Sequence, residues 1–87
     1  PNENAELKEN QFVFNFKIFK SGLIEHEGVE FTLKQFTAIA KSVFRARPSS
    51  KIVITGEEGV SITEDHPAMK TVREIGFTDV IALVVLF

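Results

Sequence analysis

The sequence predicts a single small α+β domain: an α/β two-layer sandwich in which two helices cover one face of a four-stranded mixed sheet. Three observations indicate this fold: an alternating apolar run at Phe12–Phe19, a helical apolar pattern after Thr32, and short apolar runs at Lys51–Thr55 and Asp79–Phe87. A length of 87 residues suits one core. We expect residues 1–11 to be a linker or disordered lead-in and residues 12–87 to form the domain.

The N-terminal part of the domain predicts a β-hairpin. Phe12–Phe19 alternates with a period of two and is rich in aromatic residues, which is typical of a strand. Lys20-Ser21-Gly22 supplies a turn, and Leu23–His26 follows as a short partner strand. Glu27-Gly28 is a second turn, and Val29-Glu30-Phe31 leads out of it toward the first helix.

A capping box marks the start of the first helix. The Thr32 hydroxyl can accept from a backbone N–H of the first turn, while the Gln35 side chain reaches back to the cap. Pro48 ends the helix, and Arg45 and Arg47 suit its C-terminal dipole. The apolar positions recur at helical spacing: Leu33, Phe36, Ile39, Ala40 and Val43.

The C-terminal half predicts a β-α-β unit. Lys51–Thr55 is a β-branched strand, and Thr63–Pro67 opens the second helix, because acidic residues and proline are both tolerated in a first turn. Gly76 is a natural helix terminator, and Asp79–Phe87 is the last strand. The apolar stripe of this helix is Ala68, Met69, Val72 and Ile75. The predicted order is β-β-α-β-α-β, with a right-handed crossover between the last two strands.

The last strand contains more apolar residues than expected for a sheet that has helices on only one face. Helices on one face leave the other face in water, yet every residue from Val80 to Phe87 is apolar. Uninterrupted apolar strands are normally covered on both sides. We therefore predict a homodimer, or a partner docked on this face or edge. The predicted interface residues are Val53, Val80, Ala82, Val84, Val85, Leu86 and Phe87.

No set of residues predicts catalysis, a metal site or a cofactor site. His26 is expected to be a solvated turn residue and His66 a surface residue, and neither has a nucleophile placed beside it in sequence. The loop Thr55–Gly59 matches no phosphate-binding pattern, and its two carboxylates would repel a phosphate. With a net charge of −2 and cations scattered along the sequence, nucleic acid is not an expected partner. We predict a protein that is not an enzyme.

The absence of cysteine excludes a disulfide scaffold and a thiolate metal site. The sequence has no signal peptide and no apolar run of about 20 residues. Because it begins with Pro1 rather than methionine, we interpret it as an excised piece, and a membrane anchor upstream stays possible.

The order and spacing of these segments resemble the periplasmic domain of the ExbD/TolR family from about Phe12 to Val85. The family's "AGFTDV" sequence is matched closely at the end of the second helix. Where the family has Ala-Asp after the third strand, this chain has Gly56-Glu57, and Lys70 replaces the Asp that follows Met69. The matching segments are Lys20–Ile24, Gly28, Thr32-Leu33, Ala46–Pro48, Ile52–Gly56, Val60–Ile62, Met69 and Gly76–Val80.

This resemblance implies a non-enzymatic part of a proton-motive-force-coupled energy-transducing complex, for biopolymer transport or envelope maintenance. Such proteins are anchored in the inner membrane by one N-terminal helix, and their periplasmic domain dimerises. The implied partners are an ExbB- or TolQ-like membrane protein, reached through a helix that this chain lacks, and a TonB- or TolA-like protein or peptidoglycan. The sequence leaves an alternative open: a soluble homodimeric regulatory or small-ligand-sensing α/β module.

Overall fold

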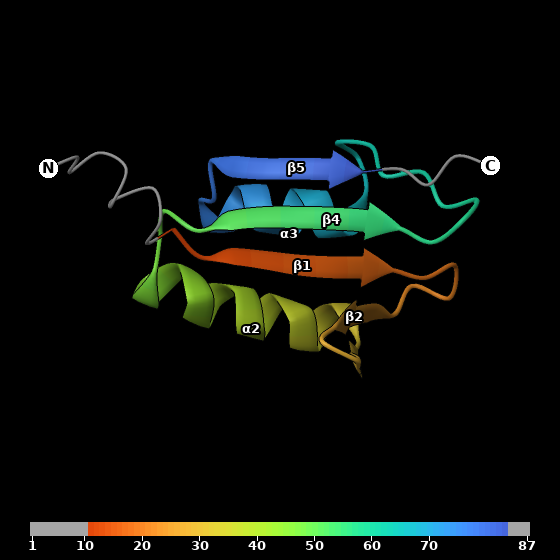
Figure 1. Ribbon diagram of the computed structural model, residues 1–87, viewed down its shortest axis with the longest axis horizontal. Coiled ribbons are helices and arrows are strands. Elements are labelled where there is room, and N and C mark those ends of the chain that lie inside the picture. The colour runs from red at the N-terminus through yellow and green to blue at the C-terminus, as the bar shows by residue number, and fades with distance from the viewer. Residues whose placement is uncertain (1–10, 84–87) are drawn as a thin grey trace, which may run out of the picture.

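The computed structural model describes residues 11–83, which form an α+β domain with two helices and a five-stranded mixed sheet (Figure 1). The predicted fold class, both helices and the mixed sheet are confirmed. The elements are, in chain order, β1 (Val13–Ile18), β2 (Ile24–His26), β3 (Val29–Phe31), α2 (Leu33–Ala46), β4 (Lys51–Gly56), α3 (Pro67–Ile75) and β5 (Asp79–Leu83). The predicted lead-in up to Asn10 and the predicted end of the last strand, Val84–Phe87, lie outside the described residues.

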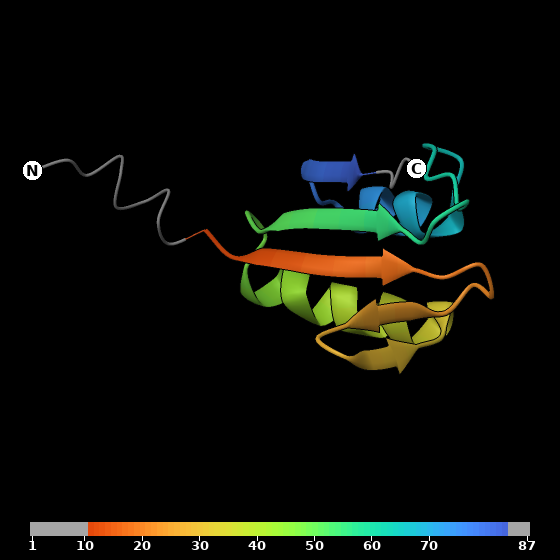
Figure 2. The same cartoon turned by 45° about the vertical axis from the view of Figure 1, so that its right-hand side comes forward.

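The prediction of four strands was wrong, because Val29–Phe31 forms β3 and pairs antiparallel with β2. A two-residue turn closes this second hairpin. Glu27 has φ 51° and Gly28 has φ 82°, and positive φ at both central residues gives the turn that matches strand twist. The short β2–β3 hairpin projects beyond β1 beside α2 (Figure 2).

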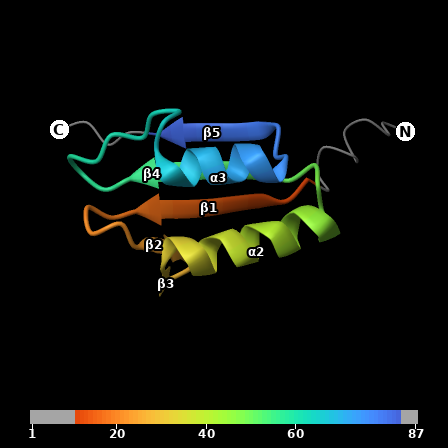
Figure 3. The ribbon, with the colours of Figure 1, turned by 180° about the vertical axis from the view of Figure 1, so that it is seen from behind.

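The strands follow the order β3-β2-β1-β4-β5. β1 pairs antiparallel with β2, whereas β1–β4 and β4–β5 are parallel pairs connected through α2 and α3. Both connections step in the same direction across the sheet, and crossovers of one hand then place both helices on one face. Opposite views show the sheet in front of the helices and the helices in front of the sheet (Figure 1 and Figure 3).

The core lies between the sheet and the two helices. Every second residue of β1 and β4 points into it, and Phe36 on α2 is completely buried. Fully burying a large apolar side chain contributes about 1.5–3 kcal/mol. The buried apolar residues are Phe16, Ile18, Ile24, Phe36, Ala40, Ile52, Ile54, Ile62, Ala68, Met69, Val72 and Phe77.

The first helix begins and ends as the sequence predicts. The Gln35 backbone N–H donates to Thr32 Oγ1 at 3.2 Å, and the Thr32 backbone N–H donates to Gln35 Oε1 at 2.9 Å. This reciprocal pair satisfies two donors that would otherwise lack partners. α2 ends at Ala46, two residues before Pro48.

The second helix begins later than predicted. It starts at Pro67, so Glu64 and Asp65 precede it, and His66 is the N-cap. His66 Nδ1 accepts from the Ala68 backbone N–H at 3.1 Å. The sequence did not indicate this role, because histidine is not a preferred N-cap residue. α3 ends where Gly76 takes φ 126°, a conformation that favours glycine.

The cap at His66 should make the stability of the domain depend on pH. Burial lowers the pKa of His66 from its ordinary value of 6.5. Because the unfolded chain binds the proton first, stability should fall as the pH drops below 6.5 and through the folded-state pKa. Protonation also removes the lone pair that caps α3, and an N-cap contact is typically worth about 1 kcal/mol.

Urea denaturation at pH 7.5 and pH 5.5 measures this effect. His66→Asn keeps a capping oxygen and removes the titration, so its stability should change less between the two pH values than that of the wild type. An equal change in both proteins would show that another group causes the pH dependence.

His26 does not lie in a solvated turn, as the sequence analysis expected. It ends β2 with a half-buried side chain, and its ring packs against Phe16 with centroids 5.1 Å apart. Nδ1 lies 2.9 Å from the Asn15 carbonyl oxygen, and Nε2 lies 3.2 Å from Glu27 Oε2. His26 thus ties the second hairpin to β1 just beyond the last pair of their ladder.

Candidate interaction surface: the open face of the sheet

Among the described residues, three of the six exposed large apolar side chains lie on the face of the sheet opposite the helices: Val13, Ile81 and Leu83. We call this face the open face, and Figure 1 looks onto it. Side chains alternate across a strand, so residues between the core-facing positions of β1 and β4 point outward. The register extends this assignment to the neighbouring strands. The open face comprises Val13, Asn15, Lys17, Glu25, Glu30, Lys51, Val53, Thr55, Asp79, Ile81 and Leu83.

Strand pairing arranges these residues in three rows. The middle row runs from Asn15 through Val53 to Ile81, and another row ends at Leu83 on β5. Ile81 is 38% exposed and Leu83 is 50% exposed, while Val53 between the neighbouring strands is half-buried. The apolar side chains therefore gather over β4 and β5. Neighbouring residues of this kind form a continuous patch rather than scattered exposures.

Charged residues of both signs flank this apolar patch. Lys17 lies opposite Glu25, and Lys51 lies opposite Asp79 in the strand register. The Asp79 carboxylate accepts from Gln11 Nε2 at 2.9 Å. No ion pair between Lys51 and Asp79 occurs among the described residues. An apolar centre with a polar border is the usual anatomy of a protein–protein interface.

The predicted interface residues are divided between the two faces. Val53 lies on the open face, whereas Val80 and Ala82 pack against the core on the helix side. Ile81 and Leu83 were missed, although alternation from the core-facing Val80 would have found them. The other predicted residues, Val84, Val85, Leu86 and Phe87, lie outside the described residues. Their place in the interface stays a prediction.

β5 also forms one edge of the sheet. Its five described residues pair with β4 on one side, and no described strand pairs with the other side. An edge of this length presents backbone N–H and C=O groups that can accept another strand. The open face and the β5 edge are adjacent, so a single partner can contact both.

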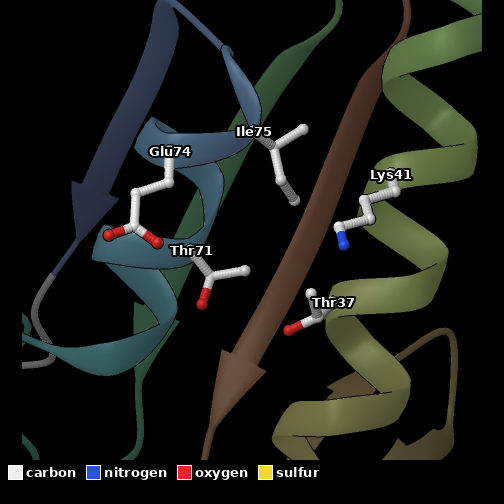
Figure 4. A pocket seen from close by; sticks show the side chains of 5 residues that line it. All are labelled: Thr37, Lys41, Thr71, Glu74 and Ile75. Atoms are coloured by element: carbon white, nitrogen blue, oxygen red, sulfur yellow. The ribbon is translucent and has the colours of Figure 1, made fainter.

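A solvent-open groove of about 320 Å³ lies between the helices on the opposite side (Figure 4). It is lined by Thr37 and Lys41 of α2 and by Thr71, Glu74 and Ile75 of α3. Both threonine hydroxyls donate to backbone oxygens one turn earlier, at 2.8 Å. The Glu74 carboxylate points away from α2 (Figure 4). The groove thus lacks the converging polar groups that orient a small ligand.

Both histidines make contacts that stabilise the fold. His66 caps α3, and His26 contacts a backbone carbonyl and an exposed glutamate. Within residues 11–83, no three His, Cys, Asp or Glu side chains are grouped closely enough to hold a metal ion. In the same residues, neither helix has the length and apolar character needed to cross a bilayer.

No protein-family model matches this chain, and no curated protein matches it significantly.

Proposed function

We propose that this chain is a non-enzymatic interaction domain that self-associates through the open face and the adjacent β5 edge. The observation that carries the proposal is the patch formed by Val53, Ile81 and Leu83, which the chain's own helices leave uncovered. Burying apolar surface contributes about 25 cal/mol per Å². A second copy would supply the missing layer on this face.

We further propose that the domain works in a proton-motive-force-coupled complex of the ExbD/TolR kind. Two features support this: the resemblance of the turns and helix ends to that family, and a two-helix α+β sheet with one face left open. In this setting the domain is the periplasmic part of a single-pass inner-membrane protein. Its partners are an ExbB/TolQ-like membrane protein and a TonB/TolA-like protein or peptidoglycan.

Capture of the native, full-length protein from its own membranes tests this assignment. The native reading frame upstream of Pro1 should encode one apolar segment of about 20 residues containing an Asp. Mild-detergent purification should then recover a polytopic ExbB/TolQ-like protein. A reading frame that starts close to Pro1, with no such segment, would contradict the membrane assignment and favour the soluble regulatory module.

A soluble regulatory module would need a ligand site, and the groove at Thr37, Lys41 and Glu74 is the surface on which one could form. A metabolite screen by thermal shift distinguishes this alternative. A ligand present at 100 times its Kd stabilises the protein by about 2.7 kcal/mol. A hit whose effect is removed by Lys41→Ala would favour the alternative over the energy-coupling proposal.

A further inference from the structure

The solvent-facing side of α2 carries a row of cations that are not adjacent in sequence. Lys34, Lys41 and Arg45 are all exposed. They are 7 and 11 residues apart, which places them within about 40° around the helix axis and along about 16 Å of its length. Between them on this side lie the small residues Ala38 and Ser42. We call this row the α2 basic stripe.

No carboxylate neutralises the α2 basic stripe. From Phe31 to Gly56 the sequence contains no Asp or Glu, so the local charge is positive although the whole chain has a net charge of −2. Among residues 11–83, no carboxylate lies within ion-pairing distance of the three cations. The stripe is one side chain wide and has no large apolar residue beside Ala38 and Ser42. This shape fits a linear acidic polypeptide better than a flat membrane surface, which also binds through apolar side chains.

The chain itself supplies such a segment, and it enters at the C-terminal end of α2. Gln11 Nε2 donates to the Ser49 carbonyl at 2.9 Å, just beyond the helix. The Arg47 guanidinium stacks on Phe12, with its carbon 3.6 Å from the ring centroid. Both contacts hold the start of the described chain beside the end of α2 that carries Arg45.

The lead-in, residues 1–10, matches the α2 basic stripe in charge and spacing. It contains Glu3, Glu6 and Glu9, with Lys8 as its one basic side chain. In an extended chain with three residues per turn, residues three apart share one side at intervals of about 9 Å. The three carboxylates would then span about 19 Å, close to the about 16 Å of the stripe. Lys8 would point to another side.

We propose that the acidic lead-in docks parallel to α2, with Glu3, Glu6 and Glu9 near Lys34, Lys41 and Arg45. The contact is electrostatic and weak. Exposed ion pairs contribute little each, and ordering the lead-in costs conformational entropy. Docking is therefore a rapidly exchanging equilibrium that salt shifts toward the released state. In a longer protein, docking on α2 would set the direction in which the chain upstream of Pro1 leaves the domain, and release from α2 would remove that constraint. It does not depend on the proposed function.

Paramagnetic relaxation in the full 87-residue chain tests this contact. The chain has no cysteine, so Asn4→Cys accepts a single nitroxide label. We expect the α2 amide signals from Lys34 to Arg45 to relax faster than in the reduced sample, while the signals of β5, at the opposite edge of the sheet from β3, change much less. Raising the salt from about 0.1 M to about 1 M shortens the screening length from about 10 Å to about 3 Å and should abolish the effect.

Two variants of equal charge change provide the control. Replacing Lys34, Lys41 and Arg45 with glutamine should abolish the relaxation effect on α2. Replacing Lys20, Lys70 and Arg73 with glutamine removes three exposed cations elsewhere and should preserve it. No effect in the wild type, or equal effects in both variants, would overturn the proposal. Broadening of α2 signals by phosphatidylglycerol vesicles, with no effect from the label, would identify a lipid surface instead and would also overturn it.

Discussion

Phe36→Ala is expected to lower the free energy of unfolding by about 3–5 kcal/mol, the usual cost of removing a phenyl ring from a core. Phe36 is 0% exposed and lies edge-on to Phe16, with ring centroids 4.9 Å apart. It joins α2 to β1, so the cavity would open between the two layers. Small domains are stable by only about 5–15 kcal/mol, so urea denaturation should show a much lower midpoint.

Leu33→Ala is the matched control, since Leu33 begins the same helix but is 37% exposed. Its loss should cost under about 1 kcal/mol, as is usual for substitutions at the surface. Equal destabilisation by the two substitutions would mean that Phe36 does not hold the layers together.

Ile81→Glu is expected to dissociate the proposed dimer while leaving the monomer folded. Ile81 is at the end of the middle row of the open face and does not belong to the core. A carboxylate buried at an interface without a partner loses its hydration. A hot-spot contact at an interface is worth about 2 kcal/mol or more, and on that scale the dimer Kd should rise by a factor of about 30 or more.

Val29→Glu is a control for the general effect of adding a carboxylate. Val29 is 54% exposed and lies on β3, away from the open face. It should leave the dimer Kd unchanged, and circular dichroism should show that both variants are folded. If Val29→Glu weakened association as much as Ile81→Glu, the interface would not be the open face.

Most of the fold could be predicted because its signals are local in sequence. The period-two run at Phe12–Phe19 contains β1, and the Thr32–Gln35 capping box marks the start of α2. In both cases the side chains that determine the element lie within a few residues of one another. The parallel pairing of β4 with β5 followed from the helix that connects them.

Features that depend on tertiary contacts were predicted less well. β3 has only three residues, too few for a periodic pattern, and it exists because Glu27 and Gly28 form a tight turn. His26 was expected in solvent because its sequence neighbours are charged, whereas its ring packs on Phe16 of another strand. The N-cap role of His66 depends on where α3 begins.

The candidate site shows the same division. The excess of apolar residues in Asp79–Phe87 indicated that the sheet needs a cover, but not which side chains face outward. Ile81 points to the open face, and Val80 contacts the core, because pairing with Val53 and Ile52 fixes the register of β5. The α2 basic stripe was likewise invisible in sequence, since Lys34 and Arg45 meet on one side only when the helix forms.

Sedimentation velocity of the wild-type chain between low and high micromolar concentration tests the central claim most directly. The account predicts a species of twice the 9.8 kDa chain mass that dissociates on dilution, and predicts that Ile81→Glu stays monomeric throughout. A wild-type chain that sediments as a 9.8 kDa monomer at the highest concentration would contradict the proposal that a second copy covers the open face.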